Sequence, residues 1–205
     1  PYLGPEYTNF IVQSTLHGYE DKVQWFKLTE EKLIKKTAEL LRGQNIIAWF
    51  QGRMEFGARA LGNRSILASP KDPKMREKLN YVIKKREGFR PFAPSVTEEQ
   101  ADRWFYVQEN IPYMNQVVNA KVRDLEAATH VDGSCRVHTV TKKQNPRYHA
   151  LITELGRIDE KAVVLNTSFN LKDQTITMTP KQAIERFINS EINYLVINNF
   201  LIRKI

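Results

Sequence analysis

The chain has 205 residues, of which 41% are hydrophobic and 26% are charged. This composition is typical of a folded globular domain, and it excludes a largely disordered or collagen-like chain. No apolar run approaches the roughly 18 residues that a membrane-spanning helix needs, and the first residues lack the basic and apolar regions of a secretory signal. The single cysteine, Cys135, cannot form an internal disulfide, so we expect a reducing, cytoplasmic setting.

Positive charge is concentrated in one part of the sequence. The formal net charge is +8, and residues 53–90 contain 11 basic and 4 acidic residues, whereas the remaining chain contains 20 and 19. An evenly basic surface would suggest nucleic acid. A single stretch rich in arginine and glycine instead favours a pocket for phosphates or other compact anions.

The first half of the chain predicts two helices around one strand and a long loop. Residues 1–28 show no strong period, and we expect an irregular linker segment there. A helix is expected from its cap, Thr29, to Gly43, and a short buried strand at residues 45–50. A glycine- and arginine-rich loop follows, and Asp72 is expected to cap the next helix.

In the second half, short apolar runs predict strands and 3.6-residue periods predict helices. The expected strands and extended segments are 90–96, 113–118, 137–140, 162–165 and a closing hairpin of 194–197 with 200–202. The expected helices are one capped by Thr97 with Gln100 and ending near Phe105, one at 147–156, and one that begins with Thr179 and Gln182. Helices alternate with strands, so the fold class is α/β, bordering on α+β, with a mixed sheet over residues 29–205.

The loop after the first predicted strand is the sharpest local signal. Gly52 and Gly57 have the spacing of the two glycines in a phosphate-binding P-loop, but the Lys-Ser/Thr pair of a true P-loop does not follow them. The loop also supplies Arg53, Arg59 and Arg64, whose planar guanidinium groups can fork onto phosphate oxygens. A solvated loop with surface salt bridges is the alternative.

Other candidate residues stand beside predicted strands. Arg90 lies in a proline-stiffened apolar segment, where a charge is costly unless it is paired. Arg136 follows an Asp-Gly turn at the start of a strand. Asn166 and Ser168 follow a buried strand directly, where α/β sheets present ligand-binding loops, although both side chains could equally cap the following turn.

The histidines and the cysteine do not indicate a nucleophile or a metal site. No pair of histidines has the spacing of metal ligands. Cys135 and His138 are three residues apart in an expected strand, which places them on opposite faces and disfavours a Cys–His nucleophile.

Five ordered motifs resemble the C-terminal region of the O-carbamoyltransferases of nodulation and antibiotic biosynthesis. They are GRMEFGARALGNRSIL, NYVIKKREGFRPFAPSV, HVDGSCRVHTV, VLNTSFN and TPKQAIERF, and the segments YLGPEY and INNFLIRK resemble the two ends of that region. The resemblance implies a YrdC-like open twisted mixed sheet with flanking helices. It also implies conversion of carbamoyl phosphate and ATP, with Mg²⁺ carried by the nucleotide, to carbamoyl adenylate. An N-terminal actin-like domain, absent from this chain, would transfer the carbamoyl group to an acceptor hydroxyl.

The same resemblance assigns roles to six residues. It implies catalytic roles for Lys84, with its neighbour Lys85 as the alternative, and for Arg90 and Arg136, and it implies substrate or nucleotide binding by Arg59, Asn166 and Ser168. The chain departs from the family pattern at Ala58, where Pro is usual, and at Cys135 and His138, where Ala and Gln are common. None of these departures removes a charged candidate.

Two other functions stay open at this point. One is a basic RNA-binding module, which would show a steep salt dependence of its RNA affinity. The other is a catalytically silent half that supports a partner domain, which would fold normally and bind no nucleotide. We expect neither nucleic acid nor a membrane as the partner.

Overall fold

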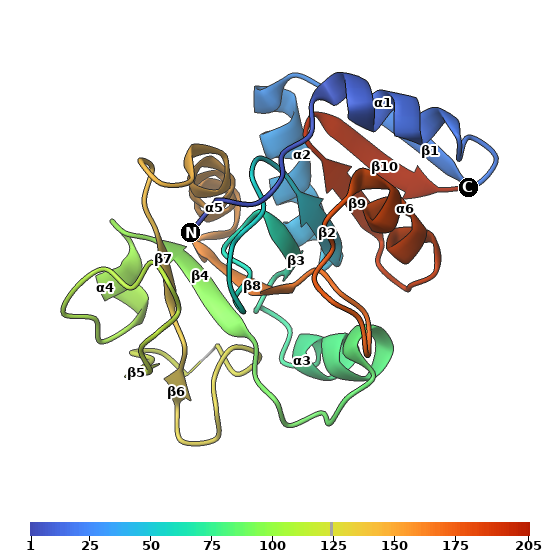
Figure 1. Ribbon diagram of the computed structural model, residues 1–205. Coiled ribbons are helices and arrows are strands. Elements are labelled where there is room, and N and C mark those ends of the chain that lie inside the picture. The colour runs from blue at the N-terminus through green and yellow to red at the C-terminus, as the bar shows by residue number, and fades with distance from the viewer. Residues whose placement is uncertain (124) are drawn as a thin grey trace.

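The computed structural model describes residues 1–123 and 125–205 (Figure 1). The strands are β1 (Val23–Lys27), β2 (Ile47–Phe50), β3 (Arg64–Ala68), β4 (Ala93–Thr97), β5 (Val118–Asn119), β6 (Ser134–Cys135), β7 (His138–Val140), β8 (Val163–Ser168), β9 (Tyr194–Ile197) and β10 (Phe200–Lys204). The helices are α1 (Asn9–His17), α2 (Glu30–Arg42), α3 (Met75–Lys78) with its π-helical continuation η1 (Leu79–Lys84), α4 (Ala101–Trp104), α5 (Pro146–Asp159) and α6 (Pro180–Ile188).

One eight-stranded sheet organises the molecule, in the order β1-β10-β9-β2-β3-β8-β4-β7. The β2–β9 and β4–β7 pairs are parallel and the other neighbours are antiparallel, so the predicted mixed sheet and α/β class are confirmed. A separate two-stranded sheet joins β5 to β6.

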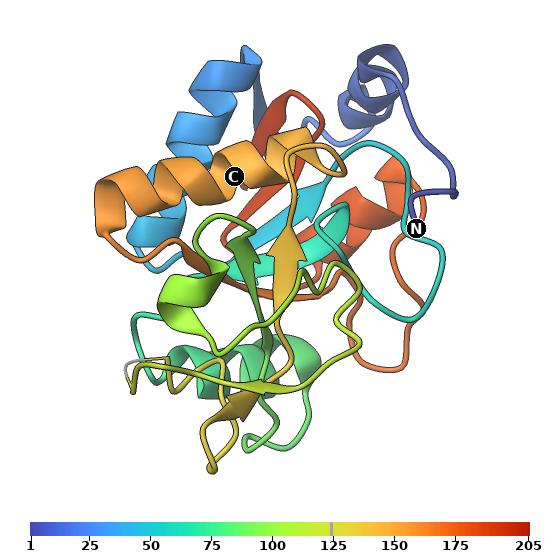
Figure 2. The same cartoon turned by 90° about the vertical axis from the view of Figure 1, so that its left-hand side faces the viewer.

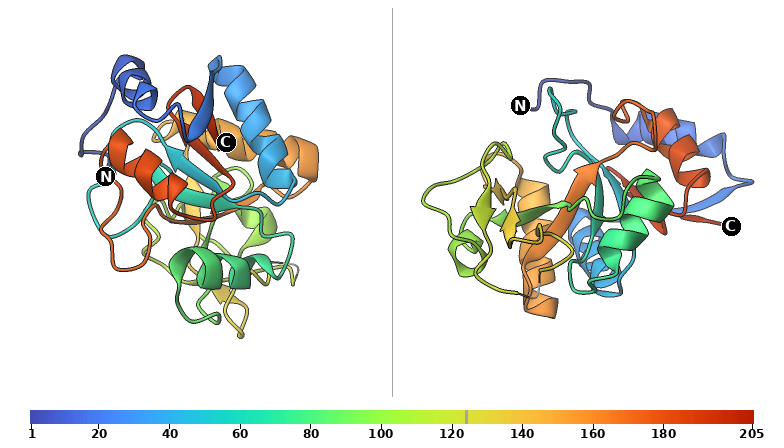
Figure 3. Two further views of the ribbon diagram at one scale, coloured as in Figure 1. Left: turned by 90° about the vertical axis from the view of Figure 1, so that its right-hand side faces the viewer. Right: turned by 90° about the horizontal axis from the view of Figure 1, so that it is seen from below.

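Helices cover both faces of this sheet (Figure 3). α2 and α5 pack against each other on one face, as Figure 2 shows, and α1 and α6 lie together on the other. Strand β2 is buried on both sides: Ile47 and Trp49 join the apolar cluster under α2 and α5, and Ala48 and Phe50 join the cluster under α1 and α6. This alternation is the two-residue period of a strand. In the part of the chain that the structure describes, no helix has the length and apolar character that crossing a membrane requires.

The predicted N-terminal caps of α2 and α6 are confirmed. The Thr29 hydroxyl accepts the Lys32 amide at the start of α2, and Gly43 ends that helix. The Thr179 and Gln182 side chains and main chains form a reciprocal capping box at α6. β9 and β10 form the predicted closing hairpin.

Several predicted boundaries are wrong, each for a tertiary reason. Residues 1–28 are not an irregular linker, because they contain α1 and β1, and β1 pairs with β10. These elements are short and gain stability by burying Val12, Leu16 and Val23 rather than from a strong local pattern. Residues 64 and 65, which the pattern assigns to the loop, begin β3, a strand held by its partners β2 and β8.

Three smaller differences concern where two helices and one strand begin or end. The helix expected at Asp72 begins at Met75, although the Asp72 carboxylate does accept the Lys74 amide at 2.9 Å. The Thr97–Gln100 capping box is not formed, because Thr97 is the last residue of β4 and Gln100 makes no side-chain cap. The strand expected at 113–118 is reduced to β5 at Val118–Asn119.

Gly62 allows a close approach between the loop and α5, and its replacement should be costly. Its φ is +94°, and an added Cβ would lie 2.2 Å from Cδ1 of Tyr148. We expect Gly62→Ala to lower the free energy of unfolding by about 2–4 kcal/mol, through backbone strain together with a clash in the core. Gly133→Ala is the matched control, because Gly133 also has a positive φ, +81°, but has open space around it. Urea denaturation of both variants measures this, and equal losses would contradict a clash at Gly62.

Candidate anion-binding site

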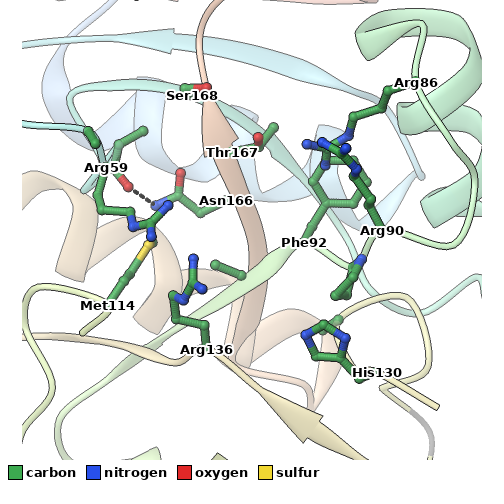
Figure 4. Close-up of a pocket in the computed structure, with 15 residues that line it drawn as sticks. Arg59, Arg86, Arg90, Phe92, Met114, His130, Arg136, Asn166, Thr167 and Ser168 are labelled. Atoms are coloured by element: carbon green, nitrogen blue, oxygen red, sulfur yellow. Dashed lines mark hydrogen bonds between the residues drawn. The ribbon is translucent and has the colours of Figure 1, made fainter. Parts of the chain in front are cut away.

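A pocket of about 460 Å³ lies beside the end of β8, and four arginines face it (Figure 4). We call it the arginine pocket; its lining residues are Ala58, Arg59, Ala60, Arg86, Arg90, Pro91, Phe92, Ala93, Met114, Ala128, His130, Arg136, Asn166, Thr167 and Ser168. None of these lining residues, all of them in the described part of the chain, is acidic. The pocket is therefore a concave site with a strong positive potential.

The arginines reach the pocket from separate segments. Arg59 and Arg136 lie on one side and Arg86 and Arg90 on the other, with Asn166 and Thr167 between them (Figure 4). Within residues 1–123 and 125–205, Arg59 and Arg136 have no hydrogen-bond or ion-pair partner, and both are exposed. Their donors are therefore available to a ligand.

The other two arginines are held by neighbouring groups. The Arg86 Nε donates to Asn80 Oδ1 at 2.7 Å, and its guanidinium lies 4.8 Å from the centre of the Phe92 ring. The Arg90 Nε lies 3.0 Å from a carboxylate oxygen of Glu87, a half-exposed pair. The pairing expected for Arg90 is thus present, but at the surface rather than in a buried strand.

Asn166 is fixed in one orientation by a buried polar chain beneath the pocket. Its Nδ2 donates to the Ala60 carbonyl at 3.0 Å and to Ser95 Oγ at 3.2 Å, and Ser95 Oγ lies 3.0 Å from His138 Nδ1. Burial lowers the pKa of His138 to about 3, so the imidazole is neutral at pH 7 and can accept the Ser95 proton. Both amide hydrogens of Asn166 are used by the protein, and its Oδ1 has no partner among the described residues.

Lys84 lies behind the pocket rather than in its wall. Its buried Nζ donates to the Ser168 carbonyl at 2.6 Å, to the Asn170 carbonyl at 3.0 Å and to Asn170 Oδ1 at 2.8 Å. Burial, together with the nearby charges of Arg86 and Arg186, lowers the pKa of Lys84 to about 7. The alternative, Lys85, is exposed.

The structure brings five of the six predicted site residues together. Arg59, Arg90, Arg136, Asn166 and Ser168 line the arginine pocket, and Lys84 touches it only through Ser168. The ligand contacts expected of all six stay predictions.

The sequence reasoning missed other members of the pocket. One of them is Arg86, and its place between Lys84 and Arg90 in the basic stretch is the signal that could have found it. Met114 lies in the segment expected as a strand at 113–118, and His130 begins the motif HVDGSCRVHTV, but neither pattern indicates that these side chains line a pocket.

The described residues indicate neither a metal site nor a reactive thiolate. Among the residues described by the structure, no group of three or more His, Cys, Asp or Glu side chains could hold a metal ion. Burial raises the pKa of the Cys135 thiol to about 12, so it is a thiol rather than a thiolate at pH 7. Mg²⁺ carried by a nucleotide stays a prediction.

The buried neutral imidazole predicts an acid-sensitive fold. The pKa of His138 is about 3 in the folded protein against an ordinary value of 6.5, so the unfolded chain takes up this proton first as the pH falls. The stabilisation from His138 is complete above pH 6.5 and is lost progressively down to about pH 3. Between about pH 7.5 and pH 4.5, wild type should lose about 2–3 kcal/mol more stability than His138→Gln in urea denaturation. Parallel losses in the two proteins would contradict a buried neutral His138.

Lys84 and Lys85 offer a matched pair of substitutions. Lys84→Gln leaves two main-chain carbonyls and the Asn170 side chain without their donor, and we expect a loss of about 1–3 kcal/mol in the free energy of unfolding. Lys85→Gln changes an exposed side chain and should stay within about 0.5 kcal/mol of wild type. Chemical denaturation of the two variants measures the two losses. Equal losses would show that the contacts of Lys84 with Ser168 and Asn170 do not stabilise the fold.

Comparison with known proteins places this chain in a family. The model of the carbamoyltransferase C-terminus family matches residues 38–204. The nodulation protein NolO of Bradyrhizobium diazoefficiens is 41% identical over 210 residues, which cover 100% of this chain and 37% of NolO. The 3'-hydroxymethylcephem-O-carbamoyltransferase of Amycolatopsis lactamdurans is 42% identical over 137 residues, which cover 65% of this chain and 26% of that enzyme.

A solved structure shows the same fold at low sequence identity. Full-length HypF, in its phosphate- and nucleotide-bound form, superposes with a TM-score of 0.55 and 16% identity over 87% of this chain and 22% of HypF. The chain spans between 34% and 37% of the length of three curated relatives that it matches nearly end to end. The family match covers most of the chain, and these relatives agree with it. The resemblance seen in the sequence motifs is therefore confirmed, and the chain belongs to the carbamoyltransferase C-terminus family.

Proposed function

We propose that this domain binds carbamoyl phosphate and ATP in the arginine pocket and forms carbamoyl adenylate. One observation carries the proposal: four guanidinium groups from three separate segments face one cavity, and none of its described lining residues is acidic. Such a site is suited to ligands that carry several negative charges in a small volume. The family match and the name of the cephem relative support the carbamoyl group as the chemistry in question.

The reaction gathers negative charge where the arginines lie. Water would first hydrolyse carbamoyl phosphate to carbamate and inorganic phosphate. An oxygen of the carbamate would then attack the α-phosphorus of ATP and form carbamoyl adenylate, with pyrophosphate as the leaving group. Charge develops on the phosphoryl oxygens during this attack, and fixed guanidinium groups stabilise it without rearranging. Mg²⁺ would be carried by the nucleotide phosphates, since the lining residues offer no carboxylate to hold it.

The neutral groups of the pocket suit the uncharged end of the substrate. Asn166 lies between the two arginine pairs, and its Oδ1, which has no partner among the described residues, would accept from the amino group of a carbamoyl moiety. The Ser168 hydroxyl donates to Asn170 Oδ1 at 2.6 Å, which leaves its oxygen as an acceptor. This arrangement supports recognition of an acyl phosphate that carries an amino group.

Transfer to an acceptor hydroxyl would be the task of the rest of the polypeptide. The curated relatives extend well beyond the matched region. We assign the acceptor site to an N-terminal actin-like domain in the same polypeptide, on the resemblance described above.

Replacing Arg136 tests the proposal most directly. Arg136→Lys keeps the charge but removes the planar, two-donor geometry that grips a phosphate. A charge-assisted hydrogen bond is worth about 1.5–3 kcal/mol, so carbamoyl-adenylate formation from carbamoyl phosphate and ATP should fall roughly ten- to a hundredfold. The thermal melting temperature should not change, because the Arg136 side chain is exposed and unpaired among the described residues.

Arg157→Lys is the control, because Arg157 is an exposed arginine on α5 paired with Glu154. It should leave both turnover and melting unchanged. Unchanged turnover in Arg136→Lys would remove Arg136 from the site. Calorimetry that finds no ATP or carbamoyl phosphate binding at millimolar ligand would favour the silent-half alternative, and steeply salt-dependent RNA binding would favour the RNA-binding one.

A further inference from the structure

The loop between β2 and β3 carries Arg59 to the arginine pocket without a helix or strand of its own. Its return limb is organised by one buried side chain, Glu55, which is 3% exposed. Glu55 Oε1 accepts three main-chain amides: that of Leu61 at 2.6 Å, that of Asn63 at 2.8 Å and that of Arg64 at 3.2 Å. The loop therefore folds around an anion that belongs to the chain itself.

This arrangement explains why the P-loop-like spacing of glycines does not produce a P-loop. In a P-loop, amides of this kind turn toward a bound phosphate. Here Glu55 occupies three amides of the return limb, and Arg59 is the charged group that this loop offers to a ligand.

The outgoing limb of the loop is held as well. The Gly4 amide donates to the Met54 carbonyl at 2.9 Å, the Met54 amide to Pro5 at 3.0 Å, and the Phe56 amide to Pro1 at 2.7 Å. Both limbs are thus fixed on either side of residues 57–60, where the chain reverses at Gly57 and presents Arg59.

We propose that Glu55 is a positioning residue of the arginine pocket, acting through the return limb of the loop to fix the place of Arg59. Glu55 itself does not line the pocket and touches no ligand in this arrangement. The inference rests on the proposed function, because it gives Arg59 a role in binding phosphate groups.

Two substitutions separate positioning from simple electrostatics. Glu55→Gln and Glu55→Ala remove the same negative charge, and that loss alone would strengthen the binding of an anion. Only Gln keeps an oxygen for the three amides, and Oε2, where its NH₂ group would stand, has no partner in the described residues that the change could break. Positioning therefore predicts that Ala weakens anion binding and that Gln restores it.

The experiment measures the affinity of the whole protein for inorganic phosphate by calorimetry at low salt. We expect Arg59→Ala and Glu55→Ala each to weaken binding by about tenfold, and Glu55→Gln to stay within about threefold of wild type. The double variant Glu55→Ala/Arg59→Ala should bind no more weakly than Arg59→Ala, because Glu55 acts only through Arg59. Glu39→Ala, an exposed site on α2, controls for the change of charge.

The outcomes separate this inference from the proposed function. If Arg59→Ala leaves phosphate binding unchanged, the proposed function and this inference both fail. If Arg59→Ala weakens binding but Glu55→Ala does not, or if the two effects add, only the role of Glu55 is wrong. Should Glu55→Ala not fold, hydrogen exchange in wild type gives a second test: the Leu61 and Asn63 amides should exchange slowly, and exchange as fast as that of an open loop would overturn the inference.

Discussion

Four guanidinium groups that face one cavity repel one another, and much of the surrounding structure holds them in place against that repulsion. Coulomb repulsion between like charges increases as the surroundings become less polar. Asn80 and the Phe92 ring hold Arg86, and Glu87 holds Arg90. Arg59 and Arg136 have no such partner among the described residues, so the loops that carry them must supply the rigidity. A polyanion bound among these guanidinium groups would relieve this repulsion.

Other basic side chains around the pocket are also held by carbonyl oxygens rather than by carboxylates. Buried Arg64 donates to the carbonyls of Pro5, Gln51, Gly52 and Asn63 and lies 3.5 Å from the Phe50 ring centre, without a carboxylate partner among the described residues. Lys84 and Arg186 hold the segment after β8 in the same way, through its main-chain carbonyls. Carbonyl oxygens satisfy the donors of a cation but leave its charge in place. The charges of Arg64 and Arg186 therefore add to the positive potential near the pocket, whereas ion pairs would cancel it.

Local signals in the sequence predicted the parts of the fold that depend on local interactions. The caps of α2 and α6 and the closing hairpin need only residues that are near in the chain, and they were predicted correctly. β3 was not, because Arg64 and Ser65 look like loop residues and become a strand only when β2 and β8 flank them. The wall residues Arg59, Arg136 and Asn166 stand in recognisable motifs. The direction of Lys84 and the role of Glu55 depend on contacts that exist only in the folded chain.

The order of strands makes the sheet a late product of folding. β2 lies between β3, which follows it closely in the chain, and β9, which is separated from it by most of the domain, and β1 pairs with β10 at the opposite end of the sequence. Pairings of such wide sequence separation form slowly, since a long loop must close before they gain anything. Until β9 and β10 have been synthesised, β2 has an open edge and β1 has no partner. During synthesis the unpaired main-chain groups of β2 would therefore be open to pairing with other chains, and a chain that stopped before the last hairpin would keep that open edge.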